Sequence, residues 1–317
     1  MPKRTALITG GAGFIGSHLL EAVIAEGWEA VVVDDLSTGQ ARHVPDEASL
    51  EVVDLTDRDA LDRTIDAARP SVIFHLGAQA SVTVSVSNPT RDCEVNVLGT
   101  MNVLEAATRH GAQVIFTSTG GALYGNAAPI PTPEGFIPAP ISPYGASKWA
   151  AEAYLVTWRE ANRLPHTVCR LGNVYGPRQS PHGEAGVVAI LSHRLWRREP
   201  PTLFGFGKPT RDYVHVHDVT RALLASVGTA GTFNISAGVE TNVVQILQAL
   251  QDAAGTTLTP ELAPLRSGEL ERSCLDPGHA AEQLGWRVEV NLQQGIEQTY
   301  RTLSEQFEAD ALSPDAR

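Results

Sequence analysis

The stretch that decides the fold is residues 9–16, Thr-Gly-Gly-Ala-Gly-Phe-Ile-Gly. It follows an apolar run over residues 4–9 and opens a helical pattern over residues 14–26, so it lies in a strand-to-helix turn. The spacing G-x-x-G-x-x-G is supplied by Gly10, Gly13 and Gly16. Glycines permit a tight turn and let a pyrophosphate approach the backbone N–H groups at the positive end of a helix. The pattern predicts a dinucleotide-binding turn, and a merely flexible turn is the alternative.

Short β-rich runs alternate with helical patterns through the first two-thirds of the chain. This alternation is typical of βαβ units and of a parallel sheet covered on both faces. Strands are expected at residues 4–9, 30–34, 50–53, 72–76, 114–118 and 167–171. Helices are expected at residues 14–26, 57–68, 93–110 and 143–162. Right-handed crossovers would wind these elements into an α/β fold with a doubly wound parallel sheet of the Rossmann type.

Beyond residue 171 the sequence changes character, because glycines and prolines punctuate two long connections that we expect to line a site. Short strands near residues 213 and 233 and helices over residues 242–253 and 292–307 predict a smaller C-terminal α/β substrate domain. The expected division is a dinucleotide-binding domain of residues 1–172 and 211–236 and a substrate domain of residues 173–210 and 237–317. The last ten residues are expected to fray.

Composition excludes several classes of protein. The 317 residues include 24 Lys+Arg against 36 Asp+Glu, a net charge of −12 that argues against a nucleic-acid partner. Cys93, Cys169 and Cys274 lie far apart, so neither a disulfide framework nor a zinc site is supported. No stretch approaches the roughly 20 apolar residues of a membrane span, and no signal peptide is recognised. We expect a cytoplasmic protein in a reducing compartment, without a metal.

Carboxylates follow two of the expected strands. Asp34, 18 residues past Gly16, ends the second strand, where a carboxylate accepts hydrogen bonds from the adenine ribose and repels a 2′-phosphate. Asp35 reinforces that repulsion, so NAD is favoured over NADP. Asp54 follows the third strand, where it is placed either to accept from the adenine amino group or to cap a helix.

Tyr144 and Lys148 stand four residues apart at the start of the helix expected over residues 143–162, so they share one helix face. A free tyrosine has a pKa near ~10, and a neighbouring ammonium stabilises the phenolate and lowers that pKa. The pair can therefore act as a general acid/base. The spacing Y-x-x-x-K alone is usually structural, but its position after the fifth strand of a glycine-turn fold favours catalysis.

Further ordered motifs extend over nearly the whole chain. They are residues 9–19 (TGGAGFIGSHL), 34–39 (DDLSTG), 75–82 (HLGAQASV), 96–100 (NVLGT), 118–125 (STGGALYG), 144–152 (YGASKWAAE), 170–179 (RLGNVYGPRQ) and 211–219 (RDYVHVHDV). Together they resemble the extended short-chain dehydrogenase/reductases, and within them the UDP-glucose 4-epimerase-like branch of the NAD-dependent epimerase/dehydratase family. The resemblance implies NAD as cofactor and a homodimer built from the helices over residues 93–110 and 143–162.

The resemblance also implies which residues hold the cofactor. Those at the pyrophosphate would be Gly10, Gly13, Phe14, Ile15 and Gly16. Those at the adenosine would be Asp34, Asp54 and Leu55. Those lining the rest of the cofactor would be Leu76, Gly77 and Ala78, with Asn96 buttressing the site through backbone contacts.

For catalysis the resemblance makes Tyr144 the proton-transfer residue, while Lys148 would hold the nicotinamide ribose and lower the pKa of Tyr144. The usual catalytic Ser/Thr position of the family falls on Gly120. Ser118 and Thr119 precede it, and we assign the hydroxyl role to Thr119. Residues 121–122 are Gly-Ala where 4,6-dehydratases have Asp-Glu, so dehydration is disfavoured.

On the substrate side, Asn173 matches a position that contacts the diphosphate or sugar, and Arg211 matches one that contacts a phosphate. In the stretch 266–269, Arg266 would bind the diphosphate and Glu269 the uridine ribose. Ser273 matches the position whose bulk limits the sugar 2-substituent, and its small size predicts that UDP-N-acetylhexosamines are accepted as well.

The resemblance therefore implies a 4-epimerase that interconverts UDP-glucose and UDP-galactose through a transient 4-keto sugar and enzyme-bound NADH. A reductase or dehydratase acting on a dTDP- or GDP-sugar is the first alternative. An NAD-binding scaffold without catalysis is the second. His215 and His217 would share one face of an expected strand, but no third ligand is evident, so a metal site is not favoured.

Overall fold

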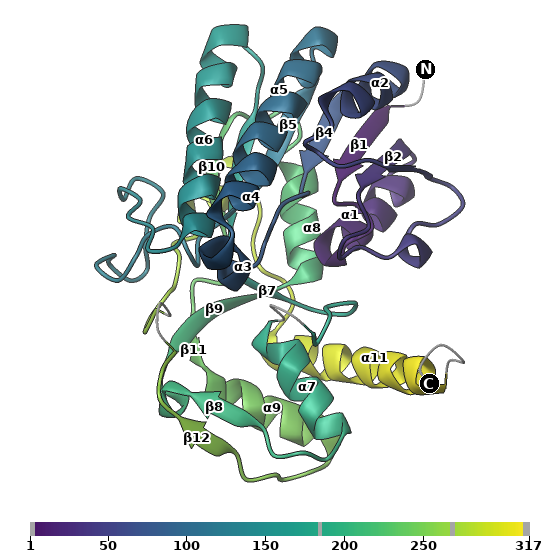
Figure 1. The fold of residues 1–317 in the computed structure, drawn as a ribbon. Helices are drawn as coiled ribbons and strands as arrows, with labels where there is room; N and C mark the ends of the chain where they lie inside the picture. Colours follow the sequence, from purple (N-terminus) through teal and green to yellow (C-terminus); the bar gives the residue numbers. More distant parts are fainter. Residues whose placement is uncertain (1–3, 183–185, 267–269, 313–317) are drawn as a thin grey trace.

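The computed structural model describes residues 4–182, 186–266 and 270–312 (Figure 1). Its larger part is built on a seven-stranded sheet in the order β10-β6-β5-β4-β1-β2-β3, with every neighbouring pair parallel. The strands are β1 (Thr5–Thr9), β2 (Glu29–Asp34), β3 (Ser49–Val52), β4 (Val72–His75), β5 (Gln113–Thr119), β6 (Thr167–Leu171) and β10 (Gly231–Ile235). The strand order reverses between β1 and β4. This confirms the predicted doubly wound sheet and places a ligand crevice at the carboxyl ends of those two strands.

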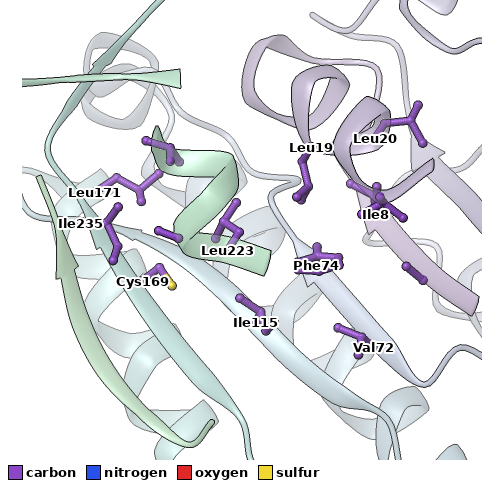
Figure 2. Close-up of a cluster of buried hydrophobic side chains, with 14 of the residues drawn as sticks. Ile8, Leu19, Leu20, Val72, Phe74, Ile115, Cys169, Leu171, Leu223 and Ile235 are labelled. Atoms are coloured by element: carbon purple, nitrogen blue, oxygen red, sulfur yellow. The ribbon is translucent and has the colours of Figure 1, made fainter. Parts of the chain in front are cut away.

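Helices cover both faces of this sheet, because alternate residues of each buried strand point in opposite directions. Ile8 and Phe74 pack on the face where α8 contributes Leu223 and α1 lies beside it (Figure 2). Leu7 and Ile73 face the layer formed by α2, α5 and α6. The five helices are α1 (Phe14–Ala25), α2 (Arg58–Ala68), α5 (Gly99–His110), α6 (Pro143–Asn162) and α8 (Val216–Ala225).

The single helix predicted over residues 93–110 is interrupted. Its first residue ends α4 (Pro89–Cys93), a π-helical turn follows at Glu94–Leu98, and α5 completes the run. Patterning missed α3 (Val82–Ser87), which precedes α4. The π-helical turn carries Asn96, which is buried and whose side-chain amide bonds groups outside its own helix. π-helical turns recur at functional positions, which agrees with the role expected of this residue.

The smaller part lies below the large sheet in Figure 1 and contains two short sheets. One has the order β11-β9-β7, from β7 (Asn173–Tyr175), β9 (Thr210–His215) and β11 (Glu240–Asn242). The other pairs β8 (Thr202–Phe204) with β12 (Glu261–Ala263). Its helices are α7 (Val187–Trp196), α9 (Val243–Ala254) and α11 (Leu292–Leu312), and α10 (Gly278–Gln283) lies against β10. Tyr175, Ile246 and Ile296 belong to one apolar core here.

Residues 211–215, which the sequence assigns to the dinucleotide-binding unit, lie in β9, which pairs with β7 and β11 of the small sheet. The chain leaves the large sheet after β6 and rejoins it at β10. The helix α11 continues to Leu312, so residues 308–312, which the sequence predicts to fray, are helical.

No helix within the described ranges is both long and apolar enough to cross a membrane.

Candidate active site

The glycine turn is closed by contacts that leave no room for side chains. Gly10 has a φ of +68°, and a Cβ there would lie 2.7 Å from the backbone nitrogen of Gly77. A Cβ at Gly16 would lie 2.1 Å from the carbonyl oxygen of Gly10. Gly13 caps α1 without a side-chain hydrogen bond, so the first N–H groups of this helix are available to an anion. The turn fits a dinucleotide pyrophosphate at Phe14 and Ile15, as proposed from the sequence.

Asp34 lies beside this turn at the end of β2. Its Oδ2 accepts the N–H of Ala12 at 3.0 Å and its Oδ1 accepts the N–H of Leu36 at 2.9 Å. Burial raises the pKa of Asp34, and these two backbone hydrogen bonds oppose the rise. Asp35 instead is exposed and bonds Ser37. The position of Asp34 fits the ribose role proposed for it, and Asp35 is the solvated member of the pair.

The helix-cap alternative for Asp54 is wrong, because α2 is capped by Asp57, which accepts the N–H of Ala60 at 3.0 Å. Asp54 instead pairs with Arg91 of α4 at 2.7 Å and accepts hydrogen bonds from Thr56. Partial burial tends to raise the pKa of Asp54, but the hydrogen bonds from Thr56 and Arg91 outweigh it and lower the pKa. The adenine role for Asp54 and its neighbour Leu55, which is buried against Gly77 and Gly99, remains a proposal.

The end of β4 is tied to β1 by Thr9. The Thr9 carbonyl accepts the N–H of Leu76 at 3.1 Å and its hydroxyl accepts the N–H of Gly77 at 3.0 Å. Asn96 then fixes the next residues, since its Oδ1 accepts the Gln79 N–H at 2.9 Å and its Nδ2 donates to the Gln79 carbonyl at 3.0 Å. These bonds hold residues 76–79, Ala78 included, at the reversal of strand order.

Tyr144 and Lys148 lie on α6, whose start is set by the N-cap Ser142 and by proline in its first turn. The Tyr144 phenol lies near the Thr119 hydroxyl at the end of β5, close enough for that hydroxyl to lower its pKa. Lys148 is only 3% exposed. Its ammonium donates to the Thr117 carbonyl at 2.9 Å and lies 4.5 Å from the centre of the Phe116 ring. One helix face and one strand end therefore bring together a phenol, a hydroxyl and an ammonium.

The pKa values of this pair differ from the sequence-based expectation. Burial raises the pKa of Tyr144 to about 12, the charge of Asp92 acts in the same direction, and the Thr119 hydrogen bond opposes both. Burial lowers the pKa of Lys148 to about 8, against the charges of Glu152 and Asp92. In the protein alone the pKa of Tyr144 therefore lies above its ordinary value, and a lowering of this pKa by Lys148 stays a prediction. The ammonium is engaged by the Thr117 carbonyl, and desolvation of the phenolate dominates.

At Gly120 the space of a side chain is occupied by Leu275. A Cβ on Gly120 would lie 2.2 Å from Cδ1 of Leu275, so a residue with a hydroxyl side chain there would require Leu275 to move. Thr119, one residue earlier, is the hydroxyl that meets Tyr144. Ser118 is 4% exposed, and in the part of the chain that the structure describes its Oγ has no hydrogen-bond partner. The geometry supports Thr119 as the catalytic hydroxyl, and Ser118 keeps its assigned role only as a proposal.

The residues proposed for the substrate come from separated segments. A Cβ on Gly121 would lie 3.5 Å from Asn173 Oδ1 and 4.0 Å from Thr119 Oγ1, so Asn173 borders the catalytic loop. Arg211, on β9, donates to the Thr210 carbonyl at 2.8 Å. The same carbonyl accepts the Ser273 N–H at 3.2 Å. Arg211 and Ser273 are therefore brought together at Thr210.

Arg266 lies further out, with its guanidinium 4.5 Å from the centre of the Phe204 ring. Glu269 falls outside the described residues, so the structure gives no account of its ribose role. Sequence reasoning missed Asp212, whose carboxylate accepts the N–H groups of Ala237, Gly238 and Leu275. Asp212 thereby joins β9 to residues 237–238 and to Leu275. In the sequence, only the motif of residues 211–219 pointed to this position.

The histidine pair does not form the strand face that was expected. His215 ends β9 and caps α8 by accepting the N–H of His217 at 3.3 Å, so His217 already lies in the helix. A residue that ends a strand and one that begins a helix do not share the period of a strand. Across the described ranges, no group of three or more His, Cys, Asp or Glu residues is placed to hold a metal ion.

The fold and this site define an α/β protein of the dinucleotide-binding class with a Tyr-Lys pair at the end of its sheet. The sequence profile of the NAD dependent epimerase/dehydratase family matches residues 6–236, and the chain belongs to this family. It is 43% identical over 301 residues to the UDP-glucose 4-epimerase of Mycolicibacterium smegmatis, covering 92% of this chain and 96% of that protein.

Two solved structures are similar over almost the whole chain. The UDP-glucose 4-epimerase of Thermotoga maritima with UDP-glucose has a TM-score of 0.94 at 42% identity, covering 96% of this chain and 99% of that chain. The UDP-glucose 4-epimerase of Thermus thermophilus in complex with NAD has a TM-score of 0.89 at 43% identity, covering 94% of this chain and 98% of that chain.

Proposed function

We propose that this chain is a UDP-hexose 4-epimerase that interconverts UDP-glucose and UDP-galactose with NAD as its bound cofactor. The observation that carries the proposal is that the Thr119 hydroxyl lies close enough to the Tyr144 phenol to favour its phenolate, with Lys148 one turn further along the same helix. This group lies next to Asn173 and at the carboxyl edge of the parallel strands. The names of the similar proteins support the same activity.

The residues present fit NAD. In the glycine turn before α1, a Cβ on Gly10 or on Gly16 would collide with backbone atoms. Asp34 presents a carboxylate beside this turn. A carboxylate at this position favours an adenine ribose with free hydroxyls over one carrying a 2′-phosphate. When bound, NAD supplies a two-electron oxidant for C4 of the sugar that is regenerated when the 4-keto sugar is reduced again, so none is consumed.

The residues then divide the work of proton transfer. Tyr144, as phenolate, takes the proton of the sugar 4-hydroxyl and later returns it to the 4-oxygen. Thr119 bonds the same oxygen and keeps it within reach of the phenol. Lys148 supplies a positive charge that favours the phenolate once its ammonium turns from the Thr117 carbonyl toward the cofactor ribose.

The substrate residues hold the nucleotide more firmly than the hexose. Arg211 and Arg266 supply cations for the diphosphate, which guanidinium groups bind through paired hydrogen bonds. Glu269 is proposed to bind the uridine ribose. Ser273, beside Arg211, leaves room at the sugar 2-position, and we propose that UDP-N-acetylhexosamines are substrates too. A loosely held hexose can turn over and accept hydrogen on its other face.

The proposed domain division puts residues 1–172 and 211–236 in the dinucleotide-binding domain and residues 173–210 and 237–317 in the substrate domain. The pairing of β9 with β7 supports moving residues 211–215 to the substrate domain. This change brings Arg211 into the same unit as Asn173.

We also propose a homodimer in the cytosol, built from α5 and α6. Apolar side chains are exposed on α6 and on α3, which packs against it; they are Trp149 and Tyr154 on α6, and Val82, Val84 and Val86 on α3. Cys93, Cys169 and Cys274 are free thiols, which agrees with a reducing compartment. Light scattering on purified protein should give twice the chain mass of 33.9 kDa, and a monomer would contradict the dimer.

The activity is tested by incubating purified protein with UDP-, dTDP- and GDP-hexoses without added cofactor and separating the products by chromatography. We expect UDP-galactose and UDP-glucose to interconvert to an equilibrium mixture. Formation of a dehydrated sugar, or turnover only with added reduced cofactor, would favour the dehydratase or reductase alternative. Bound NAD with no turnover of any sugar would favour a scaffold.

A further inference from the structure

A buried carboxylate that the proposed mechanism does not use lies next to the acid/base pair. Asp92, on α4, is 1% exposed. Its Oδ1 accepts hydrogen bonds from Gln79 Nε2 at 2.7 Å and from Asn96 Nδ2 at 3.2 Å. Both donors are neutral amides, so these bonds solvate the carboxylate without cancelling its charge. A buried ion held in this way is costly and acts strongly on neighbouring charges.

Asp92 faces α6 at the turn that carries the pair. Asn96 links the two elements, since its Nδ2 also donates to Ser147 Oγ at 3.0 Å, and Ser147 stands between Tyr144 and Lys148. The helices α4 and α6 are in contact. The charge of Asp92 acts on Tyr144 and on Lys148. One carboxylate is therefore coupled to both members of the acid/base pair.

The other charged groups around the pair are accounted for. Glu152, one turn past Lys148 on α6, forms a buried ion pair with Arg170 of β6 at 2.6 Å. His75 of β4 bonds Thr9 and Thr100, and burial followed by the charge of Lys148 lowers its pKa to about 3, so it is neutral.

On the other elements, β5 presents Thr119 and no ionisable group to the pair, and α3 has no ionisable residue. On α5, which contacts α6, Glu105, Arg109 and His110 are paired with Arg58, Asp62 and Asp66 of α2. Next to Asp92 on α4, Arg91 is paired with Asp54. Glu94 follows on the π-helical turn and is exposed. Glu152 acts more strongly than Asp92 on Lys148 but is paired with Arg170, whereas Asp92 is the carboxylate that acts on both Lys148 and Tyr144.

We propose that Asp92 is a positioning residue for the acid/base pair: its buried negative charge keeps Lys148 protonated and holds Tyr144 as a phenol until substrate and cofactor are in place. The inference rests on the proposed function, because that function makes Tyr144 and Lys148 the reacting pair. It extends the site to α4, whose Arg91 bonds Asp54 at the proposed adenine end while Asp92 acts at the proposed nicotinamide end.

Removing the negative charge of Asp92 should change the pKa values of Tyr144 and Lys148 in a direction that can be predicted. Without the nearby anion the phenolate is less disfavoured, so the pKa of Tyr144 falls, and the ammonium is less favoured, so the pKa of Lys148 falls as well. Activity needs the phenolate of Tyr144 and the ammonium of Lys148, so the two limbs of the pH profile report the pKa values of this pair. Both limbs of the profile should move to lower pH in Asp92→Asn, by about one pH unit each.

The experiment compares wild type, Asp92→Asn and the charge-retaining Asp92→Glu. The pH profile of kcat for UDP-galactose should shift to lower pH in Asp92→Asn and stay within about 0.3 pH unit of wild type in Asp92→Glu. Asp92→Ser is the second uncharged variant, and it is judged by the same shift if Asp92→Asn does not fold. Limbs that keep their pH while the maximum rate falls would overturn the proposal, because a merely structural role lowers the rate without moving them.

A second readout does not depend on turnover. Each protein is titrated by ultraviolet absorbance, and the same titration of its Tyr144→Phe counterpart is subtracted. The difference reports the ionisation of Tyr144 alone. The phenolate should form about one pH unit lower in Asp92→Asn than in wild type, and an unchanged titration would overturn the inference. If wild type epimerises no sugar and yet the Tyr144 titration shifts, the proposed function fails while the coupling to Asp92 stands.

Discussion

The two sides of the site are built in different ways. On the proposed cofactor side, each contact includes a backbone group close to one sheet edge: Gly16 lies against the Gly10 carbonyl, and the Asp34 carboxylate accepts the N–H of Ala12. On the proposed substrate side, Arg211 and Ser273 come from segments about 60 residues apart and meet at the Thr210 carbonyl. Backbone contacts tolerate almost no substitution, whereas side chains on loops can be exchanged singly. The difference suggests a fixed cofactor site and an adjustable substrate site.

The largest effect is expected where the two sides meet, at Tyr144. Tyr144→Phe removes the proton-transfer group and should lower kcat for UDP-galactose by about 1,000-fold, within the range of general acid/base catalysis. Bound NAD, measured after denaturation, should stay at the wild-type level because the glycine turn is untouched. Activity within a few fold of wild type would break the assignment.

Thr119→Ala tests the displaced hydroxyl and should lower kcat by about 30-fold, since one hydrogen bond to the reacting oxygen is lost. Thr119→Ser is the matched control because it keeps the hydroxyl, and it should recover most of the rate. If Thr119→Ser is as slow as Thr119→Ala, packing of the β5 end and not the hydroxyl is responsible.

Arg211→Met sharpens the contrast from the substrate side. Losing a charge-assisted hydrogen bond to a phosphate costs about 2 kcal/mol, so KM for UDP-galactose should rise by roughly 30-fold with little change in kcat. NAD content should not change. A fall in bound NAD would show that this arginine serves the cofactor side and that the two sides are not separate.

The smallest effect is expected for Ser273→Tyr, which fills the space proposed for the sugar 2-substituent. Turnover of UDP-N-acetylglucosamine should fall by about tenfold or more, while turnover of UDP-glucose stays within about threefold of wild type, as a pocket that excludes by size requires. Paired steady-state assays on both sugars give the ratio. Equal losses on both substrates would contradict a role in selectivity.

Much of the cofactor side could be predicted from the sequence because it depends on local rules. The glycine turn, Asp34 at the end of β2 and the helix that begins at Pro143 follow from spacing, turn chemistry and capping, and the structure has them at those positions. The number of strands before the acid/base helix also follows from periodicity.

The rest depends on contacts between distant segments, which a pattern does not contain. Nothing local shows that Leu275 fills the space above Gly120, that Asp212 joins three segments, or that Asp92 lies against α6. The direction of the Tyr144 pKa was missed for the same reason. The i,i+4 spacing places an ammonium nearby, but burial and the Thr117 carbonyl decide the outcome.

The contact between Leu275 and Gly120 sets a rule for redesign. Leu275 lies two residues after Ser273. Replacing this segment to change the sugar preference would therefore also change the side chain that packs against Gly120, in the loop after β5. A bulkier residue at 275 would push the loop, and a smaller one would open a void beneath it. Transplanted specificity segments should therefore carry leucine at this position, or be exchanged together with residues 118–121.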